Sequence, residues 1–312
     1  MKLIRLFLPV GLILLAYIVW SIGPAQLMAT VLASKVEYIL YALCLSIPAI
    51  LVMTYKWNFL LKKQGISVSF WHLAQIQLIG LFYGNISPAK LGSLVKIPYL
   101  QKATGKTMPE CSSSVIIDRL LDLIALCSFG TIGLLLLINY FAGFLYLVIF
   151  LFLGLVTGFF ILMEQRYSKP ILRVFYHHFV PASYKEMAKA SFESFYKNLP
   201  KISDVLPVFL LSLLYYVTVY TQGYIVAHAF SIELPYLFFI TATPIASLVG
   251  LIPITIAGFG TREATLVFIY SIYAIPPAAT VSFSIVSYFT LAIFPALVGV
   301  LFTFKLLGDK NE

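Results

Sequence analysis

Three charged side chains lie close together at the start of an apolar stretch that is long enough to cross a bilayer. In the segment SSSVIIDRLLDLIALCSFG they are Asp118, Arg119 and Asp122. A charge near the centre of a bilayer costs about 2.5–3.5 kcal/mol on insertion scales, so these groups must face protein, water or a lipid headgroup. Two interpretations remain open: an ion-pair clamp between helices, or a site that contacts substrate.

The spacing of these residues suggests particular partners. On a helix Asp118 and Asp122 share one face at i and i+4, and Arg119 can pair with Asp122 at i+3. An acid on another segment could also pair with Arg119, and Glu263 is the candidate we expect. Arg262 could in turn pair with Asp118 or Asp122.

Glycine and proline interrupt two other apolar segments, and cationic residues accompany both interruptions. The first is GLFYGNISPAKLGSLVKIPYLQK, with Lys90 and Lys96, and the second is GLIPITIAGFGTREATL, with Arg262. In transporters, paired broken helices direct unpaired N–H groups and a positive dipole end toward an anion. Close packing or kinks would explain either segment alone, but the pair with its cations favours a binding site.

The chain that must position these residues is too apolar for a water-soluble domain. Of its 312 residues, 61% are hydrophobic and 11% charged, whereas soluble domains have about 25% charged residues. The predicted fold class is therefore an all-α polytopic membrane protein with one or two re-entrant or broken segments. Spans of a length suited to a bilayer are expected at 4–22, 38–55, 113–138, 144–163, 205–230 and 280–304.

Lysine and arginine concentrate in alternate connections, which is the pattern of cytoplasmic loops. Lys56, Lys62 and Lys63 follow the second span, for example, whereas the four alternate connections hold only Lys35. We therefore expect a multi-pass protein of the cell membrane with both termini in the cytoplasm. The connections on both sides of 70–88 are basic, so that segment must enter and return, or lie along the surface.

We expect a single transmembrane domain over residues 1–312. Its first half, 1–164, contains the broken segment 70–100, and its second half, 205–312, contains the broken segment 236–275. The second broken segment is either a pair of half-length helices that meet at a broken turn or a hairpin of two full crossings. The polar cytoplasmic linker between the halves, at 165–204, includes an amphipathic helix that can lie on headgroups or serve as a solvated linker.

Several functional classes are disfavoured by what the sequence lacks. It contains no GxxxxGK(S/T), GxSxG or HExxH pattern, which argues against an ATP-driven pump and against hydrolases with those motifs. The four histidines and three cysteines show no spacing typical of a metal site, so we expect no cofactor. The net charge of +9 lies in short loops between spans, which favours contact with anionic lipid over nucleic acid.

Three motifs resemble the membrane domain of bacterial lysylphosphatidylglycerol synthases and flippases, together with its stand-alone bacterial and archaeal relatives. They are GNISPAKLGSLVKIPYLQKATGK, SSSVIIDRLLDL and IPITIAGFGTREA, in family order over nearly the whole chain. The resemblance implies about seven to nine spans and a domain that carries an aminoacylated or glycosylated lipid between leaflets. The synthases' soluble aminoacyl-transfer domain has no counterpart here, so only the transport half is expected.

The resemblance places the substrate site on the three motifs and implies no catalytic residue. Lys96 stands where the family often has an arginine, and this exchanges a forked phosphate grip for a point charge. The expected substrate-binding residues are Asn85, Pro88, Gly92, Lys96, Asp118, Arg119, Asp122, Gly258, Gly260, Arg262 and Glu263.

The leading hypothesis is a flippase-like transporter that works without ATP on lipids with an anionic or lipid-linked polar headgroup. The headgroup would enter a cavity between the two halves, where Lys96, Arg119 and Arg262 would engage phosphate and the acids of the motifs would balance them. One alternative is a membrane-embedded glycosyl- or acyl-lipid transferase. Another is a non-catalytic membrane subunit of a lipid- or envelope-biosynthesis complex, and an oligomer is compatible with each hypothesis.

Overall fold

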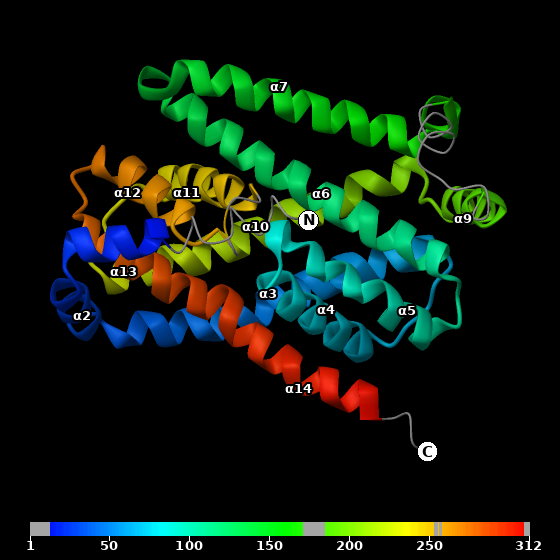
Figure 1. Cartoon of the computed structure of the whole chain (residues 1–312), viewed down its shortest axis with the longest axis horizontal. Helices are drawn as coiled ribbons and strands as arrows, with labels where there is room; N and C mark the ends of the chain where they lie inside the picture. Colours follow the sequence, from blue (N-terminus) through cyan, green and yellow to red (C-terminus); the bar gives the residue numbers. More distant parts are fainter. Residues whose placement is uncertain (1–12, 171–184, 253–254, 256–257, 309–312) are drawn as a thin grey trace.

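The computed structural model describes residues 13–170, 185–252, 255 and 258–308 of the chain (Figure 1). Within these ranges the chain consists of helices, turns and short connections, and it contains no strand. The all-α fold that the composition predicts is therefore confirmed.

The helices follow one another with short connections. After a helix at Ile13–Ile22, they are α2 (Pro24–Leu32), α3 (Val36–Lys63), α4 (Phe70–Asn85), the 3₁₀ helix η1 (Pro88–Val95), α5 (Lys96–Thr104), α6 (Met108–Leu136), α7 (Ile138–Met163), α9 (Lys185–Lys197), α10 (Ile202–Ala229), α11 (Tyr236–Leu251), α12 (Thr261–Ser271), α13 (Pro277–Tyr288), the π turn η3 (Phe289–Ile293) and α14 (Phe294–Gly308).

Five helical stretches in the described residues are long and apolar enough to cross a membrane. They are α3, α6, most of α7, α10 and the continuous run of α13, η3 and α14. A sixth crossing is possible if Ile13–Ile22 and α2, which meet at a bend of 78°, form one broken span. Helix α2 therefore occupies part of 23–37, which we expected to be a simple connection.

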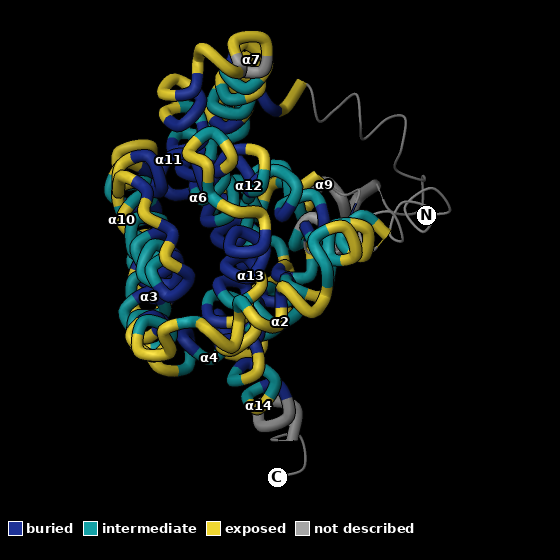
Figure 2. The backbone as a smooth tube through the Cα atoms, turned by 90° about the vertical axis from the view of Figure 1, so that its left-hand side faces the viewer, coloured by how far each residue is buried: buried dark blue, intermediate teal, exposed yellow. Residues whose placement is uncertain are grey.

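Three apolar clusters hold the described part of the bundle together, and the long helices α3 and α6 contribute to the two larger ones. One core gathers around Phe239, Tyr270 and Phe283 of α11, α12 and α13. The other gathers around Trp57 of α3 and Ile76 of α4. Figure 2 shows the buried backbone concentrated in the middle of the molecule, whereas exposed segments lie on its periphery. The exposed residues of the spans include many large apolar side chains, as expected where the surrounding solvent is lipid.

The first broken segment is a helical hairpin. Helix α4 ends at Asn85, and η1 turns back along it so that Gly92 lies against the carbonyl oxygen of Tyr83. A Cβ atom at Gly92 would lie 2.0 Å from that oxygen, so only glycine permits this approach. The chain therefore reverses direction within 70–100, as the first broken segment was expected to do.

The second broken segment is also a hairpin of short helices. Helices α11 and α12 have 16 and 11 residues, fewer than the roughly 20 that a full crossing needs. They run antiparallel, because Gly250 lies beside Gly258 at one end and Thr243 bonds Tyr270 farther along. Of our two alternatives, the pair of short helices that meet at a broken turn is the one found.

A π turn interrupts the last span between α13 and α14. It leaves carbonyl groups without their usual helical partners, and side chains from other helices bind them instead. Asn85 donates its amide to the Ala292 carbonyl oxygen at 3.0 Å, and Ser46 donates its hydroxyl to the Thr290 carbonyl oxygen at 3.3 Å. These bonds connect α4 and α3 to the last span.

The amphipathic helix expected in the linker is present as α9, although part of 165–204 lies outside the described residues. It docks on the bundle next to the ends of α3 and α6. The Asn198 carbonyl oxygen accepts a hydrogen bond from the Gln64 amide at 2.7 Å, and Thr107 and Ser194 share a hydroxyl contact at 3.3 Å.

Some helices pack closely because a glycine, which has no Cβ atom, lies against the backbone of the neighbouring helix. An added Cβ at Gly133 of α6 would lie 2.2 Å from the Thr241 carbonyl oxygen of α11. We predict that Gly133→Ala destabilises the protein by about 1–3 kcal/mol, because the helices must move apart. The measurement is the temperature at which the detergent-purified protein loses its monodisperse gel-filtration peak.

Gly143→Ala is the control, because a Cβ at this exposed position of α7 meets nothing within 4 Å. Equal thermal stability of the two variants would contradict the packing explanation.

Candidate functional site

A cavity of about 370 Å³ lies between the two halves of the bundle, and its mostly apolar lining carries several charged side chains. It is lined by residues from α3, α4, η1, α5, α6, α10, α11, α12, α13 and the π turn, so both broken segments contribute to it. Six of the expected site residues line it: Asn85, Lys96, Asp118, Arg119, Asp122 and Arg262. The cavity that we expected between the halves is therefore present.

Two lysines and two aspartates form a buried cluster on one side of the cavity. Lys56 of α3 binds both Asp118, with 2.9 Å between Nζ and Oδ1, and Asp122. Lys96 of α5 binds the other Asp118 oxygen at 3.1 Å. The side chains of Lys56 and Asp118 are 0% and 2% exposed, so each charge depends on its partners. The cluster joins α3, α5 and α6.

Neutral groups complete the surroundings of Lys96. Its ammonium donates to the Gln77 amide oxygen at 3.0 Å and lies 4.5 Å from the centre of the Trp57 ring, a cation–π distance. Its aliphatic stem crosses Gly80, where an added Cβ would come within 2.7 Å of Cγ. Lys96 is thus held in the cluster, and its charge is already compensated by Asp118.

The ion pairs differ from those that the sequence suggested. Arg119 does not pair with Asp122 or Glu263, and Arg262 does not pair with Asp118 or Asp122. The missing partner was Lys56, which we placed in a loop after the second span. Helix α3 extends to Lys63, eight residues beyond the predicted end of that span, and this brings Lys56 inside the bundle.

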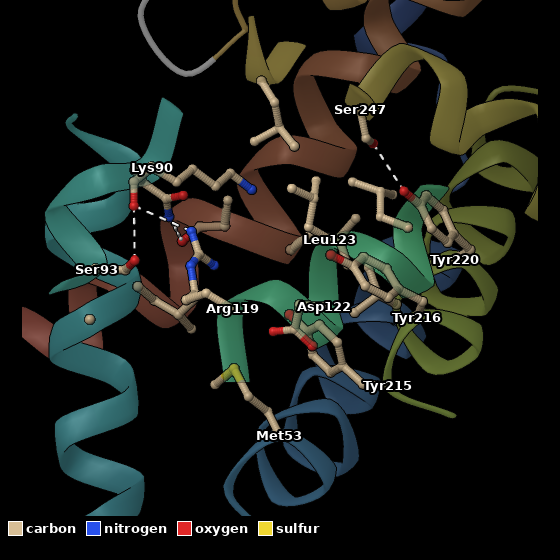
Figure 3. A pocket seen from close by; sticks show the side chains of 18 of the residues that line it. Met53, Lys90, Ser93, Arg119, Asp122, Leu123, Tyr215, Tyr216, Tyr220 and Ser247 are labelled. Atoms are coloured by element: carbon tan, nitrogen blue, oxygen red, sulfur yellow. Dashed lines mark hydrogen bonds between the residues drawn. The ribbon is translucent and has the colours of Figure 1, made fainter. Parts of the chain in front are cut away.

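Three cations remain without a carboxylate partner in the part of the chain that the structure describes. The Arg119 guanidinium donates to the Lys90 carbonyl oxygen at 3.3 Å, and that of Arg262 donates to the Ser284 carbonyl oxygen at 2.8 Å. Arg262 also lies 5.3 Å from the centre of the Tyr288 ring. Lys90 extends its side chain into the cavity above Arg119 (Figure 3). All three line the cavity.

Tyrosines of α10 form the opposite wall of the cavity, with Asp122 between them and the cations (Figure 3). Tyr216 and Tyr220 are stacked, and the Tyr220 hydroxyl bonds the Ser247 hydroxyl at 3.0 Å. Tyr288 of α13 also lines the cavity, is 7% exposed, and its hydroxyl has no hydrogen-bond partner among the described residues. A buried hydroxyl without a partner is a group that a ligand could satisfy.

Glu263 caps the helix that we expected to offer its free N-terminus to an anion. Its carboxylate accepts hydrogen bonds from the Gly260 N–H and the Ser284 hydroxyl, both at 2.7 Å. The side chain is buried and does not line the cavity. Glu263 therefore already provides the negative charge that the helix N-terminus favours, and anion binding in the cavity depends on side-chain cations instead.

The expected site glycines shape the broken segments and do not line the cavity. Gly258 and Gly260 have φ of 82° and 85°, a region that glycine enters without strain, and Gly258 lies against Gly250. Gly92 closes the first hairpin on α4. The side chain of Pro88 lies outside the described residues, although its backbone begins η1.

Lys56, Lys90 and the tyrosines of α10 are absent from the residues expected at the site. Lys90 follows the first break directly, and the sequence pattern already counted it among the cations that favour a binding site there, although not among the expected binding residues. The tyrosines lie on a span with no break or charge, so nothing in the sequence distinguishes them from lipid-facing aromatic residues.

Removing Lys56 should destabilise the protein because Asp122 then loses its ion-pair partner. We predict that Lys56→Met costs about 3–5 kcal/mol, measured as a lower unfolding temperature in detergent. Adding Asp122→Asn should restore much of that stability, because Asp118 keeps Lys96. Lys62→Met, at an exposed position of the same helix, is the control. A double variant no more stable than Lys56→Met would contradict the pairing.

Similarity to known proteins agrees with this architecture. The sequence profile described as lysylphosphatidylglycerol synthase TM region matches residues 4–299. The UPF0104 membrane protein MJ1595 of Methanocaldococcus jannaschii is 24% identical over 298 residues, covering 89% of this chain and 87% of that protein. A UPF0104 membrane protein of Methanothermobacter thermautotrophicus is 23% identical over 302 residues, 89% and 88% of the two chains. The chain belongs to the family of the lysylphosphatidylglycerol synthase transmembrane region.

Proposed function

We propose that this protein moves a lipid with an anionic headgroup between membrane leaflets without ATP. The observation that carries the proposal is the group of three cations, Lys90, Arg119 and Arg262, that line the central cavity without a carboxylate partner in the described residues. Unpaired charges inside an apolar bundle are costly, and a phosphate group would compensate them with charge-assisted hydrogen bonds.

Two further features support transport of a lipid. The headgroup would sit among the cations while its tails remain in the surrounding bilayer. The two hairpins, α4 with η1 and α11 with α12, form parts of the cavity wall, and discontinuous helices of this kind form the substrate sites of many transporters. Membership of a family described by a lysylphosphatidylglycerol synthase membrane region supports a lipid substrate.

A transporter accounts for the acids of the cavity better than a transferase does. Asp118 and Asp122 each accept an ion pair from Lys56, and Asp118 a second from Lys96. Acids held in this way serve poorly as general bases, because ammonium groups already occupy the oxygens that would take a substrate proton. We therefore assign them a structural role beside the headgroup.

The same proposal places the protein in the cell membrane with both termini in the cytoplasm. With Lys56 inside the bundle, Lys62 and Lys63 still mark the end of α3 as basic, and Lys63 pairs with Asp204 at 3.1 Å. The distribution of basic residues over the connections thus keeps its asymmetry.

The proposal is tested with purified protein in liposomes that contain fluorescent lipids with zwitterionic or anionic headgroups. Protein-dependent movement between leaflets is followed as loss of dithionite-accessible fluorescence. We predict faster movement of anionic lipids, and a decrease of about 10- to 100-fold in Arg119→Gln and Arg262→Gln, since each loses a charge-assisted bond worth about 1.5–3 kcal/mol.

Lys62→Gln, an exposed position outside the cavity, should match the wild type. Folded wild-type protein that accelerates no lipid would refute the transport function. If both arginine variants still accelerated lipid movement as the wild type does, Arg119 and Arg262 would not take part in transport.

A further inference from the structure

We propose that the cavity selects a headgroup with two negative charges, a phosphomonoester or a diphosphate, over a singly charged phosphodiester. This inference rests on the proposed function and specifies the class of substrate. It comes from the charge balance, the conformation of Lys90 and the number of available donors.

The charges in and beside the cavity do not balance. In the described residues, five cations face three carboxylates, and two positive charges remain even when Glu263, which lies outside the lining, is included. The cations are Lys56, Lys90, Lys96, Arg119 and Arg262, and the carboxylates are those of Asp118, Asp122 and Glu263. A phosphodiester would neutralise one of the two charges, whereas a phosphomonoester would neutralise both.

Lys90 is one of the cations that the carboxylates leave unbalanced. Arg119 and Arg262 are close enough to repel its ammonium group, and Asp122 offsets them only in part. Its backbone has φ of 56°, a region that residues other than glycine seldom adopt. Two hydrogen bonds to its carbonyl oxygen, from Ser93 Oγ at 2.8 Å and from Arg119, hold it there. The fold therefore keeps a lysine aimed into a cationic cavity, as an anion site requires.

The donors match the oxygens of a phosphomonoester. Lys90, Arg119 and Arg262 come from three different elements, η1, α6 and α12, and all three line the cavity. The buried Tyr288 hydroxyl adds a fourth donor that has no partner. A phosphomonoester presents three terminal oxygens, and a phosphodiester presents two. The cavity therefore has enough donors to bind the third terminal oxygen of a phosphomonoester and enough positive charge to compensate its second negative charge.

The experiment compares two fluorescent lipids with identical tails in the reconstituted vesicles: a phosphomonoester lipid and its methyl phosphodiester. At about pH 7.5 the monoester carries close to two charges, since its second pKa is near 6, while the methyl ester keeps one. We expect protein-dependent movement of the monoester to be at least about 10-fold faster, the effect of one more charge-assisted contact. Lowering the pH to about 5 should bring the ratio toward one.

Lys90→Met is the variant that tests the residue. It should lower the ratio of monoester to methyl ester at about pH 7.5, while the exposed control Lys62→Met keeps the wild-type ratio. A ratio near one in the wild type, with both anionic lipids still faster than a zwitterionic lipid, would overturn the inference and leave the proposed function standing. A wild-type ratio that Lys90→Met does not change would also overturn it.

The same phosphate chemistry could belong to a soluble ion. Uptake of labelled inorganic phosphate and diphosphate into the vesicles distinguishes the two sources. Movement of the monoester lipid without uptake of the free ions supports both the dianion preference and the lipid function. Uptake of diphosphate without movement of any lipid supports the dianion preference and contradicts the lipid function. Absence of both processes in folded protein overturns both.

Discussion

A charged side chain can remain inside an apolar helical bundle only where other charges compensate it, and the Lys56 ion pairs satisfy this condition here. They connect α3 to α6, and Lys96 extends the connection to α5. They also fix the rotation of α6. Asp118 and Asp122 share the face toward the lysines, so Arg119, about 100° away around the helix, is directed to the cavity. The charges of the cluster thus compensate one another, whereas the charge of Arg119 remains available to a ligand.

The two broken segments bring further cations to the cavity, each on a short helix. Gly92 allows η1 to fold back on α4, which presents Lys90, and the positive φ of Gly258 and Gly260 leads into α12, which presents Arg262. The glycines thus act on the course of the backbone. The uncharged tyrosines of α10 form the wall opposite the cations. The electrostatic field of the cavity is therefore directed from the cations toward the tyrosines, and it would orient a bound anion.

Much of the fold was predictable because hydrophobic length and glycine–proline breaks are local features of a sequence. The spans, the two hairpins and the cavity cations Arg119 and Arg262 follow from such features. The ion pairs did not, because Lys56 lies near the predicted end of a span and only the full length of α3 shows that it is buried. The role of Glu263 was also missed, since a carboxylate three residues after Gly260 can cap its own helix as readily as bind a distant arginine.

In the proposed function, Lys90, Arg119 and Arg262 together hold an anionic lipid headgroup. The most direct measurement is an experimental structure of the protein in nanodiscs that contain a phosphomonoester lipid. We predict phosphate density in the cavity within hydrogen-bond distance of all three cations, with tails that leave toward the bilayer. Lipid phosphate bound only elsewhere on the protein, with Lys90 turned out of the cavity or paired with a carboxylate, would contradict it.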